Sequence, residues 1–160
     1  MTKPTLDYLA AKTAHQITQV IGTEVKKQNK VAPKDVEILV TKALGVLQSQ
    51  GVYAMALFLF SRSGKESEES NMSAEERTAT QILSWLWPLR NPQNALKDLQ
   101  TNNNQPQTDK NSNQVNSDKN NMLREWANIS SNLDTLLLVR DLYEQTLIYA
   151  RYHAKALGGE

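Results

Sequence analysis

The sequence predicts an all-α protein, folded as a single-domain bundle of about five or six helices. Apolar residues recur three and four positions apart in several long segments, which is the spacing of one helical face. Residues 52–60 are nine successive apolar or aromatic residues, preceded by Gly51 and followed by Gly64 a few positions later. Nine residues are too few to cross a bilayer and too many for one face of a surface helix. We therefore expect a central helix that is buried on most sides.

Two amphipathic helices are expected before the central one. The second begins at Pro33, whose missing N–H costs nothing in the first helical turn, and ends at Gly51. The first covers residues 5 to about 28. Its apolar stripe consists of Leu6, Leu9, Ala10, Thr13, Ala14, Ile17, Val20, Ile21 and Val25.

A further helix is expected to begin at Ser73. Ser73 and Glu76 form the pattern of a capping box, in which each side chain binds a free backbone N–H near the other. The helix should end near Trp87, because Pro88 disfavours helical geometry in the residue before it. Trp85 and Trp87 cannot both face the buried side, so one of them is expected at a rim. Packing under a neighbouring loop is the favoured interpretation, and contact with a partner or a stacked base is the alternative.

Residues 101–121 interrupt the helical pattern. Eleven of these 21 residues are Asn or Gln, and Val115 is the only aliphatic one. Such a segment cannot bury enough apolar surface to offset the entropy of ordering it. We expect a disordered insertion within one domain that covers residues 1–160. A short helix that begins at Asn91 and Pro92 should precede the insertion, and a helical turn or two should follow it at residues 122–129.

The longest helix is expected over residues 133–157, with Gly158 as its terminator. Its predicted buried stripe consists of Leu136, Leu137, Val139, Tyr143, Leu147, Ala150, Ala154 and Leu157. Arg140 lies off the centre of this stripe and is spaced to pair with Glu144.

Cations gather at two places, although the whole chain is almost neutral, with 18 Lys and Arg against 17 Asp and Glu. A basic site for nucleic acid must therefore be a local patch. The candidate phosphate-binding residues are Lys26, Lys27, Lys30 and Lys34 around the end of the first helix, and Arg140, Arg151 and Lys155 on the last helix. A solvated helix end or face is the favoured interpretation of each cluster when it is taken alone.

Motifs for catalysis, metals or cofactors are missing from the sequence. There is no cysteine, no phosphate-binding loop, no dinucleotide fingerprint and no nucleophile elbow. His15 and His153 are the only histidines, and neither has a second histidine or a carboxylate three or four positions away. We expect a protein without enzymatic activity, cofactor or metal. The absence of cysteine and of a secretory or membrane segment favours the cytoplasm.

Three stretches together resemble the small all-helical subunit of the type III-B CRISPR effector, the Cmr complex. They are Gly51-Val-Tyr-Ala-Met-Ala-Leu-Phe-Leu-Phe-Ser-Arg62, Thr80-Gln-Ile-Leu-Ser-Trp-Leu-Trp87 and Leu138-Val-Arg-Asp-Leu-Tyr-Glu-Gln-Thr-Leu-Ile-Tyr-Ala-Arg-Tyr-His-Ala154. The likeness covers most of the chain outside residues 65–73 and 92–121. It departs from the family at Tyr149 and Ala150, where Trp-Leu is common, and in the Asn-rich insertion.

The resemblance implies a subunit without a catalytic centre. It would stack in several copies beside the subunits that hold the crRNA and would help to bind the target RNA, with Trp85 and Trp87 as candidate contacts to partners. Two other classes of function stay open. One is a helical adaptor that binds only protein, and the other is an enzyme whose site would show as a polar pocket at His15 or His153.

Overall fold

Seven α-helices and one 3-10 helix make up almost all of the structure described here, a computed structural model. The structure describes residues 5–25, 29–63, 72–100 and 115–158, and at residues 98–100 and 115–119 it describes the backbone alone. In chain order the helices are α1 (Leu6–Thr18), α2 (Pro33–Gln50), α3 (Val52–Arg62), α4 (Ala74–Leu86), η3 (Trp87–Arg90), α5 (Pro92–Gln100), α6 (Val115–Ile129) and α7 (Leu133–Gly158). The predicted all-α bundle is confirmed. Within the described ranges, no helix combines the length and the apolar character that a membrane span needs.

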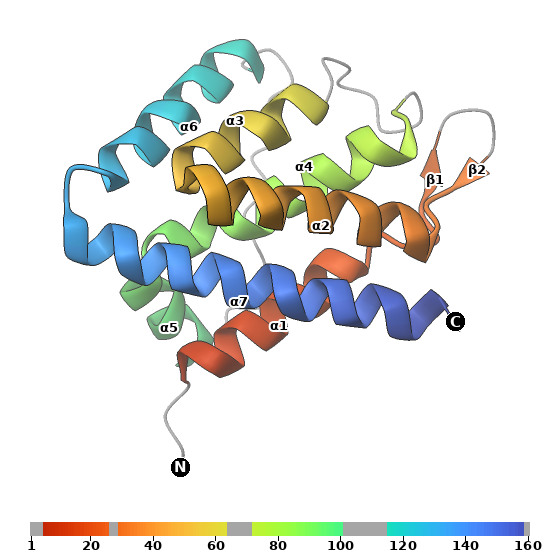
Figure 1. The fold of residues 1–160 in the computed structure, drawn as a ribbon, viewed down its shortest axis with the longest axis horizontal. Coiled ribbons are helices and arrows are strands. Elements are labelled where there is room, and N and C mark those ends of the chain that lie inside the picture. The colour runs from red at the N-terminus through yellow and green to blue at the C-terminus, as the bar shows by residue number, and fades with distance from the viewer. Residues whose placement is uncertain (1–4, 26–28, 64–71, 101–114, 159–160) are drawn as a thin grey trace.

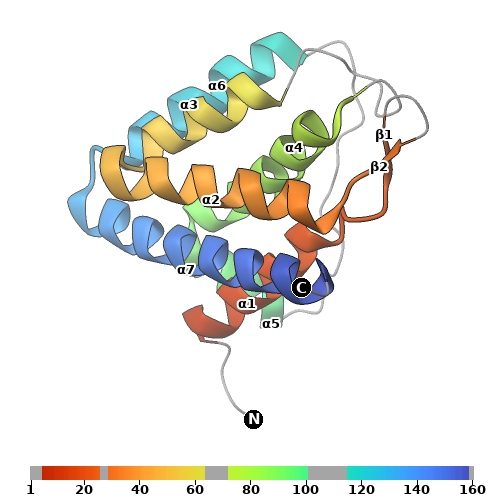
Figure 2. The same cartoon turned by 45° about the vertical axis from the view of Figure 1, so that its right-hand side comes forward.

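Helix α7 crosses the whole bundle and packs along both α1 and α2 (Figure 1). It runs antiparallel to α2 and ends beside the start of that helix (Figures 1 and 2). Its buried stripe is Val139, Leu142, Tyr143, Thr146, Leu147, Ala150 and Ala154. The predicted extent of this helix is confirmed, but Leu137 and Leu157 were wrongly placed in the stripe, because they are 49% and 60% exposed. Leu142 and Thr146 take the buried positions between the two flanking helices.

Helix α1 is shorter than predicted and ends at Thr18. The chain then turns through Gly22, whose φ of 88° is accessible to glycine without strain. The Gly22 N–H donates to the Val31 carbonyl oxygen at 2.8 Å, which holds the short antiparallel strands β1 (Glu24–Val25) and β2 (Asn29–Lys30) together at their base. Val20 and Val25 are buried, as expected for a helix, but they reach the core from the turn and from β1.

Helices α2 and α3 meet at Gly51, as predicted. Its φ of 99° lets the chain change direction between the two helices without a gap. The buried residues of α3 include Met55 and Leu59, which face α2, α4 and α6. Among residues 52–60 only Tyr53 and Leu57 are exposed, at 39% and 43%, so the prediction that this helix is buried on most sides holds except at these two positions. Gly64 lies outside the described residues.

Helix α4 begins where the capping pattern predicted. The Ser73 hydroxyl oxygen accepts a hydrogen bond from the Glu76 backbone N–H at 3.2 Å. The helix ends at Leu86, and the chain continues through the 3-10 helix η3 that contains Pro88. Helix α5 then begins at Pro92, as expected.

Helix α6 begins at Val115, seven residues before the predicted start at Met122. The helical segment expected after the insertion therefore begins earlier than predicted, and residues 101–114 lie outside the described part of the chain. Two buried side chains, Trp126 and Ile129, hold the C-terminal half of α6 against the core. Once that half is packed, a helix extends toward its N-terminus one hydrogen bond at a time, which requires no apolar side chains.

A buried aromatic group joins α4, α6 and α7. Trp126 and Tyr143 are both fully buried, and the Trp126 indole N–H donates to the Tyr143 hydroxyl oxygen at 3.0 Å. The Tyr143 O–H in turn donates to the Leu86 carbonyl oxygen at 2.9 Å. Phe60 and Trp87 meet the Trp126 ring edge-on, with ring centroids 5.6 and 5.1 Å away. Burial raises the pKa of Tyr143 well above its usual range.

Replacing Leu59 with alanine should lower the free energy of unfolding by about 2–5 kcal/mol, because the side chain is fully buried and the substitution leaves a cavity. Leu57→Ala on the same helix is the matched control and should cost less than about 1 kcal/mol, because that side chain is half-exposed. Urea unfolding of each variant measures the difference. Equal costs at the two positions would contradict the packing of α3.

Replacing Tyr143 with phenylalanine should cost about 1–3 kcal/mol, because the Trp126 N–H then loses its acceptor inside the core. Tyr152→Phe is the control, because the Tyr152 side chain is 64% exposed. The raised pKa of Tyr143 adds a second readout. Above a pH of about 10 the unfolded chain loses this proton and the folded chain keeps it, so wild-type stability should fall more steeply with rising pH than that of Tyr143→Phe.

Candidate nucleic-acid interface

Two lysine ammonium groups flank one carboxylate where α2 begins and α7 ends. The Lys34 Nζ lies 3.4 Å from Glu37 Oε2, and the Lys155 Nζ lies 4.0 Å from Glu37 Oε1. The Glu37 side chain is only 16% exposed, whereas the two lysine side chains are 72% and 46% exposed. Glu37 compensates one of the two positive charges, so the group keeps one net positive charge that faces the solvent.

Arg151 adds a further cation one helical turn before Lys155. The guanidinium of Arg151 takes part in none of the ion pairs found among the described residues. Its Nε atom is buried and has no hydrogen-bond partner there. A buried Nε is out of reach of an anion in solution, so only the Nη groups of this half-buried side chain can meet one.

The antiparallel packing of α2 and α7 creates this cluster from residues far apart in the sequence. Gly158 at the end of α7 lies so close to Pro33 that a Cβ on the glycine would be 3.6 Å from the proline Cβ. Lys30 lies four residues before Lys34, exposed on β2 and paired in register with Glu24. We call the four cations at this end of the molecule the basic edge: Lys30, Lys34, Arg151 and Lys155.

Arg140 does not belong to the basic edge. It lies eleven residues before Arg151 on α7, or about 16 Å along the helix. Its guanidinium donates to the Gln48 carbonyl oxygen at 3.0 Å, close to the C-terminus of α2. Glu144 accepts a hydrogen bond from the Gln48 amide at 3.3 Å, in place of the predicted pairing with Arg140. Lys26 and Lys27, the other two predicted residues, lie outside the described part of the chain.

The two tryptophans that were candidates for partner contact are both half-buried and pack against the core. Trp87 lies edge-on to Trp126, and the Arg90 guanidinium carbon lies 3.7 Å from the centre of its ring. This stacked arginine occupies a face of Trp87 that a base or a partner would otherwise use.

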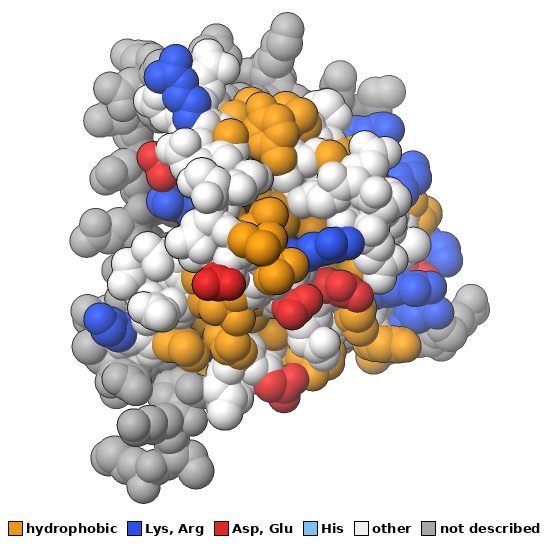
Figure 3. Space-filling view, turned by 60° about the vertical axis from the view of Figure 1, so that its left-hand side comes forward, with side chains coloured by type: hydrophobic (Ala, Val, Ile, Leu, Met, Phe, Trp, Pro, Cys, Tyr) orange, Lys and Arg blue, Asp and Glu red, His pale blue; other side chains and the backbone are white. Residues whose placement is uncertain are grey.

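Eight large apolar side chains are exposed among the described residues, and four of them lie at the end of the molecule opposite the basic edge. Figure 3 shows this face, where orange apolar patches lie between acidic and basic side chains. The large exposed apolar residues of the helices at this end are Tyr53 and Leu57 on α3, and Leu133 and Leu137 on α7. The other four are Tyr8, Ile38, Tyr152 and Leu157. This apolar face was not predicted from the sequence, because three of its four residues, all except Leu133, were expected to be buried.

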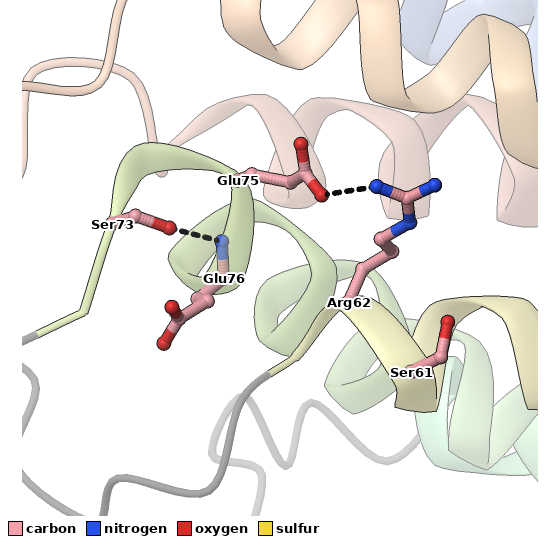
Figure 4. A pocket seen from close by; sticks show the side chains of 5 residues that line it. All are labelled: Ser61, Arg62, Ser73, Glu75 and Glu76. Atoms are coloured by element: carbon pink, nitrogen blue, oxygen red, sulfur yellow. Dashed lines mark hydrogen bonds and ion pairs between the residues drawn. The ribbon is translucent and has the colours of Figure 1, made fainter.

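An open polar depression lies between the end of α3 and the start of α4 (Figure 4). Arg62 and Glu75 form an ion pair across it at 2.9 Å. The Ser73 hydroxyl caps α4, and the Ser61 hydroxyl donates to the Phe58 carbonyl oxygen at 2.6 Å. These groups serve the helix ends, and the side chains that line the depression include no histidine to act as a base.

The two histidines, which are far apart in the sequence, lie side by side in the structure. The His15 ring on α1 and the His153 ring on α7 have centroids 5.7 Å apart. The polar depression between α3 and α4 includes neither histidine among the residues that line it. No local pattern in the sequence indicates this pair, because the two residues come from helices at opposite ends of the chain.

No protein-family model, curated protein or solved structure matches the chain. Function must therefore be argued from the surface itself. The basic edge presents flexible ammonium groups and one guanidinium, which attract phosphate oxygens but read no base. The arrangement favours sequence-independent binding of a polyanion.

Proposed function

We propose that the protein is a non-catalytic, RNA-binding structural subunit of a type III-B CRISPR effector complex. The observation that carries the proposal is the basic edge, where the Lys34 ammonium is exposed and the Arg151 guanidinium takes part in none of the ion pairs found among the described residues, on a chain that is nearly neutral as a whole. The resemblance to the small Cmr subunit adds the biological context. Its three stretches coincide with α3, with the second half of α4 and with most of α7.

RNA binding by this edge would depend on charge. Lys34 and Lys155 are held near each other by Glu37, and Arg151 lies one turn away, so several phosphates of one strand could be neutralised together. The subunit would position target RNA beside the crRNA without making or breaking bonds. The apolar face of Tyr53, Leu57, Leu133 and Leu137 would pack against further copies or other subunits.

The same apolar face favours the second candidate, a helical adaptor that binds only protein. The two functions differ in what the basic edge does. A subunit of the effector should copurify with crRNA and should lose RNA affinity when the basic edge is changed. A protein adaptor should do neither.

Changing Lys34 and Lys155 together to alanine should weaken binding of all single-stranded RNA sequences about equally. The slope of log affinity against log salt should flatten by about 0.7 to 1.4, because each lost phosphate contact on a single strand contributes about 0.7. The matched control is Lys97→Ala with Arg124→Ala, which removes the same charge from exposed positions on α5 and α6. Titrations at several salt concentrations measure both doubles. An equal loss of RNA affinity in the two double variants would show that the basic edge is not the RNA-binding site.

Changing Glu37 to glutamine should have the opposite sign and tighten RNA binding by a factor of about 1.4 to 5. The substitution removes the carboxylate that compensates Lys34 and Lys155, at nearly constant volume. The expected size corresponds to the 0.2–1 kcal/mol typical of exposed ion pairs. Weaker binding by Glu37→Gln would show that the carboxylate orients the lysines, and unchanged binding would show that RNA binds elsewhere.

A further inference from the structure

His15 and His153 lie side by side outside the basic edge, and histidine is a common metal ligand. They come from α1 and α7, two helices that pack along each other. Their ring centroids are 5.7 Å apart and their ring planes are inclined by 56°. His15 is exposed and His153 is half-buried, so an ion from solution can reach the pair.

The distance between the rings fits one shared metal ion. An imidazole nitrogen lies about 2.0–2.1 Å from a bound Zn²⁺, which places the ring centre about 3.2 Å from the ion. Two such rings at a tetrahedral angle have centres about 5.2 Å apart. The observed 5.7 Å is close to this value, and a small rotation of either side chain covers the difference.

We propose that His15 and His153 bind one divalent late transition-metal ion, of the class of Zn²⁺, Ni²⁺ or Cu²⁺. Neutral imidazole nitrogen suits these ions, whereas Mg²⁺ and Ca²⁺ prefer oxygen ligands. The described residues contain no group of three or more His, Cys, Asp or Glu placed to hold a metal. Two histidines therefore supply the protein ligands, and water or a donor from another molecule completes the coordination.

Metal binding at this pair would join α1 to α7. The two ligands are 138 positions apart in the sequence and are brought together only in the folded chain. The ion should therefore bind the folded state much better than the unfolded one and raise its stability by mass action. This inference is independent of RNA binding, because neither histidine belongs to the basic edge.

The test is a Zn²⁺ titration of the full chain, purified without a polyhistidine tag. We expect one Zn²⁺ per chain and a rise in melting temperature of about 5–10 °C when free Zn²⁺ is about 100 times its dissociation constant. Mg²⁺ at the same concentration should cause no rise. His15→Ala and His153→Ala should each weaken Zn²⁺ binding by at least about tenfold, because one of two ligands is lost.

Lys12→Ala is the matched control, one helical turn before His15 on α1, and should leave Zn²⁺ affinity unchanged. Equal Zn²⁺ affinity in the wild type and in both histidine variants would overturn the proposal, as would an equal loss in Lys12→Ala. If a histidine variant fails to fold, a spectrum of the wild-type protein still tests the site. The electron paramagnetic resonance spectrum of the Cu²⁺-loaded protein should show coupling to two imidazole nitrogens, and coupling to one or none would also overturn the site.

Discussion

The packing of α7 between α1 and α2 is the constraint on which the rest of the structure depends. Seven side chains of α7 form one buried stripe, and the two flanking helices must both cover it. Because α2 runs antiparallel to α7, the first residues of α2 lie beside the last residues of α7. The same packing brings Lys34 beside Lys155, and His15 beside His153. Both candidate sites are therefore consequences of how the core is buried.

Most helices could be predicted because their ends carry local signals. Pro33, Gly51 and Ser73 each act within one turn of the chain, and the structure places a helix end at each. The end of α1 was missed because buried Val20 and Val25 fit a continued helix as well as a turn and strand, and only the positive φ of Gly22 distinguishes the two. The early start of α6 was missed because helical extension from a packed end needs no apolar pattern.

For the candidate sites, the sequence predicted which types of residue would take part but not which of those residues lie together. Cations on the last helix were expected, but which of them share an edge depends on the register between α2 and α7. That register places Arg151 and Lys155 at the start of α2 and holds Arg140 on the Gln48 carbonyl at the other end. The exposure of the apolar face could not be predicted from the sequence. An apolar residue on a helical stripe fits the pattern equally well whether or not a neighbouring helix covers it. Leu137 was assigned to the core for this reason.

The long axis of α7 separates two surfaces that would serve different partners. The 26 residues of α7 span about 39 Å, with the exposed Leu133 and Leu137 at one end and Lys155 at the other. A strand of RNA at the basic edge therefore would not compete with a protein at the apolar face. Glu37 limits the positive charge of the basic edge, and under the proposed function this would keep the affinity of one copy for RNA low. Under the proposed function, strong RNA binding would then require several copies acting together, because each linked copy raises the effective concentration of the next.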